Sequence, residues 1–144
     1  MKTPTQHLLE KSVKVTAQRA AVLEFLQGNL DHPSPDEVYR KVHKRFPYIS
    51  RATVYNTLKT LVKAGMLQEV LIQQDKTRVD PNTSRHHHFK CLKCKTVEDM
   101  PYDLMTADRV RTSLKAYRVT DVRMVIEGLC ARCRRTGGAS KRFP

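Results

Sequence analysis

The sequence lacks any apolar run as long as a membrane-spanning helix, and it shows no signal peptide and no internal repeat beyond two cysteine pairs. We therefore expect no membrane partner and a reducing, cytoplasmic location, where disulfides are rare. Acidic side chains are also scarce: 14 Asp and Glu stand against 27 Lys and Arg, for a formal net charge of +13 over 144 residues. Such an excess of basic groups indicates a polyanionic partner, most simply nucleic acid.

The basic excess is uneven along the chain. Residues 1–66 hold 11 basic and 5 acidic side chains, and residues 132–144 hold 5 basic side chains and none that is acidic. The first half of the chain and its tail are therefore the parts expected to meet a polyanion.

Four cysteines form two Cys-x-x-Cys pairs, Cys91 with Cys94 and Cys130 with Cys133. Two such pairs supply the four thiolates of a tetrahedral structural zinc site. The alternatives are two disulfides or four buried thiols, and a reducing compartment disfavours disulfides. We expect a structural zinc ion that ties together two distant parts of the second half of the chain.

The first half has the pattern of a small helical module followed by a hairpin. Capping residues and apolar periodicity predict the helices, and alternation predicts two strands. The predicted helices cover residues 4–12, 17–27, 35–46 and 51–64, and the predicted strands cover residues 67–72 and 77–79. This order is that of a winged helix-turn-helix domain.

The helix over residues 51–64 is the expected DNA reader. Arg51, Tyr55 and Lys59 lie one turn apart along one edge, and Asn56 lies further round the face that is not apolar. Cations that seek phosphate, together with side chains that can touch base edges, are typical of a recognition helix. The alternative is an ordinary solvated face, but the basic charge and the wing favour DNA.

The second half begins after the polar, proline-bearing segment Asp80–Ser84, which predicts a hinge. We expect strands near residues 88–90, 96–98 and 117–126, and a helix over residues 103–115. So few elements bury little apolar surface, which motivates both a zinc ion and a partner subunit.

The predicted fold class is therefore α+β, with a winged-helix domain and a small α/β dimerisation domain stapled by zinc. The expected boundaries are 1–79 for the DNA-binding domain, 80–85 for the hinge, 86–135 for the dimerisation and metal-binding domain, and 136–144 for a basic, disordered tail.

Several motifs together resemble the Fur family of metal-dependent bacterial transcriptional repressors, over roughly residues 10–135. They are Lys14-Val15-Thr16-Ala17-Gln18-Arg19, His32-Pro33-Ser34-Pro35-Asp36-Glu37-Val38-Tyr39, Ala52-Thr53-Val54-Tyr55-Asn56-Thr57-Leu58, the histidines before Cys91, and the closing cysteine pair. The resemblance implies DNA binding as a homodimer and a structural zinc site at the four cysteines.

Within that family, the sequence is most similar to the peroxide-sensing PerR branch. That branch binds a regulatory metal through three histidines and two aspartates, which fall here on His32, Asp80, His86, His88 and Asp99. The iron-sensing branch has a Glu near the hinge position and often adds a carboxylate and a histidine where Thr106 and Val122 stand here.

The donor types favour the same interpretation. Imidazole and carboxylate without thiolate suit Fe(II) or Mn(II) and leave an open position. His86 and His88 alternate along a predicted strand, so both project to one side, with Asp99 on the neighbouring strand. His7, His43 and His87 are interpreted as ordinary side chains.

The resemblance implies that metal fixes the two domains in one arrangement, so that a dimer matches a palindromic operator in double-stranded DNA. It also implies that peroxide, acting with bound Fe(II), oxidises His32 or His86 and releases the metal, and we expect no other small-molecule substrate. An iron-, manganese- or zinc-responsive regulator of metal uptake is the alternative. A non-haem metal enzyme is a more distant one, and the lack of a general base or a glycine-rich pocket motif disfavours it.

Overall fold

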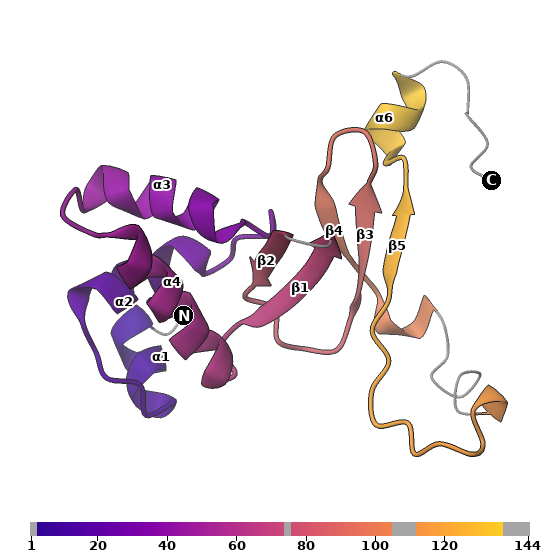
Figure 1. Cartoon of the computed structure of the whole chain (residues 1–144), viewed down its shortest axis with the longest axis horizontal. Helices are drawn as coiled ribbons and strands as arrows, with labels where there is room; N and C mark the ends of the chain where they lie inside the picture. The colour runs from indigo at the N-terminus through magenta and orange to yellow at the C-terminus, as the bar shows by residue number, and fades with distance from the viewer. Residues whose placement is uncertain (1–2, 74–75, 105–111, 137–144) are drawn as a thin grey trace. The chain divides into compact units, whose positions relative to one another are not determined.

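The computed structural model describes residues 3–73, 76–104 and 112–136 (Figure 1). The chain divides into two compact units, Met1–Ser84 and Arg85–Pro144. Each unit is described by itself.

Unit 1 begins with four helices whose starts follow from capping residues. They are α1 (Pro4–Glu10), α2 (Ala17–Leu26), α3 (Pro35–Arg45) and α4 (Arg51–Lys63), with N-caps Thr3, Thr16, Ser34 and Ser50. Each cap oxygen accepts a hydrogen bond from a backbone N–H in the first turn, which would otherwise lack an intrahelical partner. Gly28 (φ 72°) follows α2 and Gly65 (φ 65°) follows α4, where the left-handed backbone favours glycine.

A hairpin completes unit 1. β1 (Gln68–Gln73) pairs antiparallel with β2 (Lys76–Asp80). Each of the four helices and strand β2 contributes at least one fully buried apolar side chain to the core. These side chains are Leu8, Val22, Leu26, Val38, Val54, Leu61 and Val79. Helices α1 to α4 surround one apolar core, and the hairpin of β1 and β2 follows them as a wing. This is the predicted winged helix-turn-helix.

Unit 2 contains a three-stranded sheet in the order β4–β3–β5 (Figure 1). β3 (His87–Cys91) pairs antiparallel with β4 (Val97–Met100) and parallel with β5 (Val125–Gly128). A 3₁₀ turn, η1 (Tyr102–Leu104), follows β4, and a short helix, α6 (Ala131–Arg135), follows β5. This mixed helix and sheet architecture confirms the predicted α+β class.

The apolar content of unit 2 is small. Among its described residues, the buried apolar or thiol side chains are Val97, Cys91 and Cys133. Two of these three carry thiols, so the cysteine cluster is a large part of what holds the unit together.

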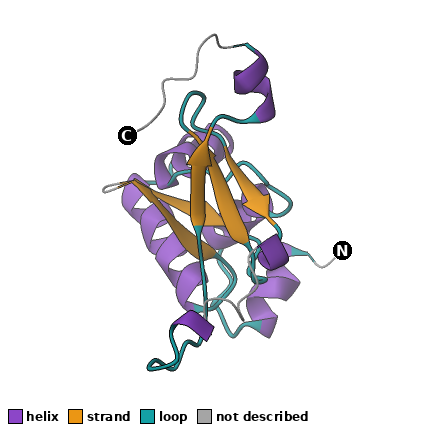
Figure 2. Ribbon diagram, turned by 90° about the vertical axis from the view of Figure 1, so that its right-hand side faces the viewer, coloured by secondary structure: helices purple, strands orange, loops and turns teal. Residues whose placement is uncertain are grey.

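The predicted strand over residues 117–126 is wrong for most of its length. Regular pairing begins only at Val125, and the chain that leads into β5 is irregular (Figure 2). Asp121 accepts hydrogen bonds from the Val122 N–H and the Arg123 side chain, and such local bonds compete with a strand ladder. Within the described residues, β3 starts only at His87, so in the register that pairs His88 with Val125 it offers no partner to the residues before Met124.

Other predictions fall partly or wholly outside the described residues. Of the helix predicted over residues 103–115, residues 105–111 are outside, including Thr106, and most of the predicted basic tail at 136–144 is outside too. In the described parts of the chain, no helix is long and apolar enough to cross a membrane.

Candidate metal centres and DNA-contacting helix

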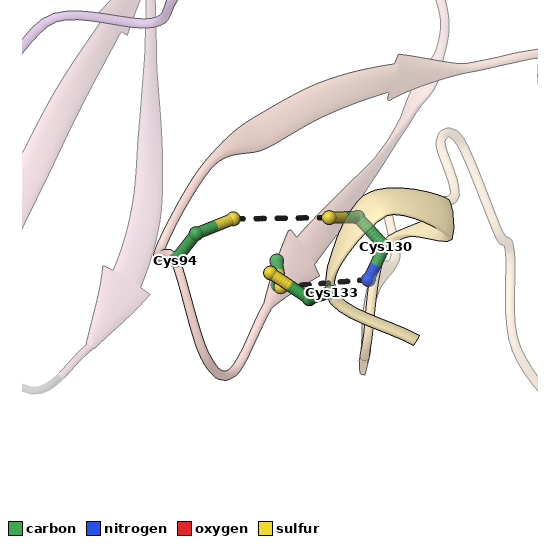
Figure 3. Close-up of side chains that lie close together, drawn as sticks. Cys94, Cys130 and Cys133 are labelled. Carbon is green, nitrogen blue, oxygen red and sulfur yellow. Dashed lines mark hydrogen bonds between the residues drawn. The ribbon is translucent and has the colours of Figure 1, made fainter. Parts of the chain in front are cut away.

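The four cysteines of unit 2 lie close together, and Figure 3 shows Cys94, Cys130 and Cys133 of this cluster. Cys91 ends β3, Cys94 follows in the turn, Cys130 is the N-cap of α6 and Cys133 lies within α6. Their Sγ atoms all lie within 4.8 Å of one another, and all four are free thiols. The Cys94 and Cys130 sulfurs are 3.8 Å apart, well beyond the roughly 2 Å of a disulfide bond. The cluster fits a structural zinc site.

Hydrogen bonds prepare two of these sulfurs to be thiolates. The Cys130 N–H donates to Cys91 Sγ at 3.4 Å, and this contact lowers the pKa of Cys91. The Thr96 hydroxyl lies 3.2 Å from Cys94 Sγ and lowers the pKa of Cys94 to about 5. Burial raises the pKa of Cys133 to about 12. A divalent cation would supply the charge that favours ionisation of all four thiols.

A second group of possible metal ligands lies at the start of β3 and on the neighbouring strand β4. His86 precedes β3, His88 lies within it, and Asp99 lies opposite His88 on β4. The Nε2 atoms of the two histidines are 3.0 Å apart. Asp99 Oδ1 lies 3.4 Å from Nε2 of His86 and 4.0 Å from Nε2 of His88.

This geometry suits a cation. Both imidazoles are buried, at 8% and 7% exposure, and both turn the same ring nitrogen toward one carboxylate oxygen. Two nitrogen lone pairs and one carboxylate on one side of a sheet form a two-histidine, one-carboxylate set that leaves other positions open.

Unit 1 holds a buried pair of the same chemistry. His32 Nε2 lies 3.8 Å from Asp80 Oδ1, and the two residues are 1% and 2% exposed. The Nδ1 atom of His32 lies 3.0 Å from the Leu30 carbonyl. Because a carbonyl oxygen can only accept, Nδ1 is the donor in this contact, and the other ring nitrogen, Nε2, faces Asp80. A backbone bond of this kind orients a metal-ligating histidine.

Backbone contacts fix where His32 lies. Arg78 Nη1 donates to the His32 carbonyl at 2.9 Å, and the Val79 N–H donates to the Pro33 carbonyl at 3.0 Å. His32 itself has a left-handed φ of 47°, which is uncommon for a residue other than glycine. The end of β2, which carries Asp80, is therefore tied to the segment that carries His32.

The start of α3 reinforces this tie. Ser34 and Glu37 form a capping box, and Arg78 Nη1 also lies 3.5 Å from the Glu37 carboxylate. Burial raises the pKa of Glu37, but the hydrogen bonds from Ser34 and the charge of Arg78 outweigh it and lower the pKa overall. Asp80 is held as well, because the Asn82 N–H donates to Oδ1 at 2.7 Å and the Gln68 amide donates to Oδ2 at 3.0 Å.

The predicted DNA-contacting side chains all project from the outer face of α4. They are exposed, whereas Val54, Leu58 and Leu61 on the opposite face are buried. The four outward residues are Arg51, Tyr55, Asn56 and Lys59.

Two of these side chains share a partner on α3. Arg51 Nη1 lies 2.6 Å from Asp36 Oδ1. Burial raises the pKa of Tyr55, and the nearby Asp36 carboxylate raises it further.

Sequence reasoning did not find the residues that hold these groups in place. Arg78, Thr96 and Asp36 act through contacts between elements, and their positions in the sequence give no signal of it. His87, interpreted as ordinary, is 1% exposed and packs against Tyr102, with ring centroids 5.3 Å apart.

Comparison with known proteins gives a consistent match. Residues 10–127 match the model of the ferric uptake regulator family. The peroxide-responsive repressor PerR of Staphylococcus epidermidis is 34% identical over 131 residues, which cover 90% of this chain and 87% of that protein.

Solved structures agree with the sequence match. The Vibrio cholerae ferric uptake regulator aligns with a TM-score of 0.73 at 28% identity, over 88% of this chain and 98% of that one. The Campylobacter jejuni peroxide stress regulator aligns with a TM-score of 0.66 at 29% identity, over 90% and 95% of the two chains.

Proposed function

This chain belongs to the ferric uptake regulator family, and we propose that it is a metal-dependent transcriptional repressor that senses hydrogen peroxide. The observation that carries the proposal is the set of donors in its two units. His32 with Asp80, and His86 with His88 and Asp99, are buried or half-buried groups of nitrogen and carboxylate without thiolate. The peroxide-responsive repressor of S. epidermidis, at 34% identity, supports the peroxide branch.

Two metals have separate roles in this proposal. Cys91, Cys94, Cys130 and Cys133 hold structural Zn(II), which suits four thiolates. His32, Asp80, His86, His88 and Asp99 hold regulatory Fe(II) or Mn(II), which suit imidazole and carboxylate.

The proposed regulatory ligands come from both units of the chain. If all five residues bind one ion, the ion favours one arrangement of unit 1 relative to unit 2. At free metal about 100-fold above its Kd, the binding-competent arrangement gains about 2.7 kcal/mol. That is enough to shift a two-state population substantially. Metal removal returns the units to other arrangements and weakens DNA binding.

DNA recognition follows from α4 in a homodimer. Two copies of the recognition helix, held at a fixed spacing, match the two halves of a palindromic operator in double-stranded DNA. The second unit offers a surface for pairing: within the described residues, β5 is an edge strand whose Val125 and Ile126 are 41% and 39% exposed.

Peroxide ends repression by changing a ligand. A ferrous ion held by these histidines and aspartates would supply the electrons that cleave the O–O bond of peroxide. His32 or His86 exchanges a ring C–H for C–OH, and the other oxygen of the peroxide leaves as water. The modified ring would be a poorer ligand, so the remaining residues would hold the ion less tightly and would no longer favour one arrangement of the two units.

A regulator of iron, manganese or zinc uptake is the second candidate, and the structural similarity to the V. cholerae ferric uptake regulator favours it. Such a protein would respond to metal concentration alone. The S. epidermidis and V. cholerae proteins are both named as regulators, which supports a role in regulation and not in catalysis.

The two candidates differ in one binding experiment. The wild-type chain selects a duplex from a random pool in the presence of Mn(II), and binding to that duplex is then followed by fluorescence anisotropy. We expect peroxide to release the Fe(II)-loaded protein and not the Mn(II)-loaded protein. If peroxide releases neither the Fe(II)-loaded nor the Mn(II)-loaded protein from the duplex, the peroxide-sensing function is contradicted and the regulator of metal uptake is favoured.

A further inference from the structure

Asp36, in the first turn of α3, contacts two residues on the DNA-facing side of α4. Its Oδ1 lies 2.6 Å from Arg51 Nη1, and its negative charge is close enough to the Tyr55 hydroxyl to raise the pKa of that tyrosine. Arg51 and Tyr55 lie one helical turn apart, so their side chains leave α4 on the same side. A single carboxylate on the neighbouring helix therefore reaches both.

A carboxylate in the first turn of a helix usually serves that helix, through the cap or the dipole. Here Glu37 already closes the capping box, because it accepts hydrogen bonds from both the backbone N–H and the hydroxyl of Ser34. Asp36 instead turns toward α4, where its carboxylate pairs with Arg51 of the recognition helix.

The guanidinium of Arg51 has a second support. Its central carbon lies 5.0 Å from the centroid of the Tyr39 ring, which is also on α3. Carboxylate on one side and aromatic ring on another restrict the long arginine side chain to one region. The Arg51 and Asp36 side chains are still 64% and 52% exposed, so the pair adds little to folding stability and leaves other N–H groups of Arg51 able to contact DNA.

We propose that Asp36 is a specificity-determining residue: it holds Arg51 and Tyr55 in the orientation that reads the operator. The inference rests on the proposed function, because it assumes that α4 reads DNA. A side chain fixed in its bound orientation loses less entropy on binding the correct sequence.

The same carboxylate penalises the wrong sequence. Placed beside the DNA-facing side of α4, its negative charge opposes phosphate contacts that any duplex offers. This repulsion acts on every duplex, and only the operator offsets it through the base contacts of the oriented Arg51 and Tyr55. The two effects of Asp36 together therefore favour discrimination.

The test compares two duplexes, using the Mn(II)-loaded full-length chain. One duplex is selected by the wild type from a random pool, and the other has the same composition in shuffled order. Asp36→Asn keeps the shape of the side chain and removes its charge. We expect it to bind the shuffled duplex about two- to fivefold more tightly, the size of a released surface ion pair, and the selected duplex no more tightly.

Glu24→Gln is the matched control. It frees Arg45 from a surface pair of 2.9 Å with similar exposure and makes the same change in net charge, but the arginine that it frees is on α3 and not on the recognition helix. We expect it to leave the ratio of the two Kd values unchanged.

An equal gain on both duplexes with Asp36→Asn would overturn the inference, because Asp36 would then act only as a charge near DNA. No change on either duplex would overturn it too. If the wild-type protein selects no duplex from the pool, the proposed DNA-binding function is contradicted, and the role of Asp36 with it. A selective wild type with an unaffected Asp36→Asn variant removes only the role of Asp36.

Discussion

Asp99 lies directly opposite His88 in the antiparallel pair of β3 and β4, with its Oδ1 4.0 Å from Nε2 of that histidine. Strand register sets this relationship, because a slip of one residue would turn Asp99 to the other face of the sheet. At this position, the length of the Asp99 side chain determines where its carboxylate oxygens lie relative to His86 and His88.

Asp99→Glu lengthens that side chain by one methylene and keeps its charge. We predict that the variant still binds Mn(II) and the selected duplex but responds slowly or not at all to peroxide with Fe(II), because reactivity depends on ligand geometry more strongly than affinity does. Release from DNA after peroxide, measured by anisotropy, checks this.

His86→Ala is the comparison for that variant, since it removes a ligand and should lose both metal and DNA binding. A normal peroxide response in Asp99→Glu would show that the carboxylate position does not control the reaction.

Arg78→Ala removes no ligand and should still weaken regulatory metal binding. Arg78 donates to the His32 carbonyl and lies 3.5 Å from Glu37, so its loss frees the segment that holds His32 beside Asp80. We predict about a 10- to 100-fold rise in the Mn(II) Kd, as for other residues that orient ligands.

Titration calorimetry with Mn(II) measures this effect. Arg45→Ala removes an arginine from the surface pair with Glu24 and should leave the Kd unchanged. Equal affinities for wild type and Arg78→Ala would mean that the tie between β2 and His32 does not support the site.

Cys91→Ser removes one of four thiolates from the end of β3. Because zinc binding is coupled to folding and unit 2 buries little else, we predict loss of zinc and unfolding or monomerisation of residues 86–135. Zinc content and sedimentation of the purified variant test this together. A zinc-loaded dimer of unchanged stability would contradict the structural role of the cluster.

Tyr55→Ala should weaken binding to the selected duplex while Mn(II) affinity stays the same, since α4 carries none of the proposed ligands. Lys59→Ala should weaken binding more evenly across sequences and reduce the salt slope by about one, as the loss of a phosphate contact does. Anisotropy at several salt concentrations separates the two effects, and unaltered binding in both variants would place the recognition face elsewhere.

Much of unit 1 could be predicted from sequence because its signals are local. The capping box Ser34–Glu37 predicts where α3 begins, and the apolar face of Val54, Leu58 and Leu61 predicts the buried side of α4. The spacing within each cysteine pair and the alternation of His86 and His88 are local signals too. That the two distant cysteine pairs meet follows from the four ligands that a tetrahedral zinc ion needs.

The rest depends on contacts between distant segments. The alternating residues 117–124 resemble a strand, but a strand needs a partner, and β3 begins only at His87. α6 was not predicted, because its five residues follow a cysteine and carry no apolar stripe. Arg78 and Asp36 gain their roles from segments 46 and 15 positions away in the sequence, which no local pattern reveals.

The central claim is that peroxide modifies a ligating histidine of the regulatory site, and intact mass tests it most directly. Wild-type protein loaded with Fe(II) and treated with peroxide should gain one oxygen atom, localised by peptide mapping to His32 or His86. The Mn(II)-loaded protein should gain none under the same treatment. An Fe(II)-loaded protein that gains no oxygen on either histidine and stays bound to DNA would contradict peroxide sensing.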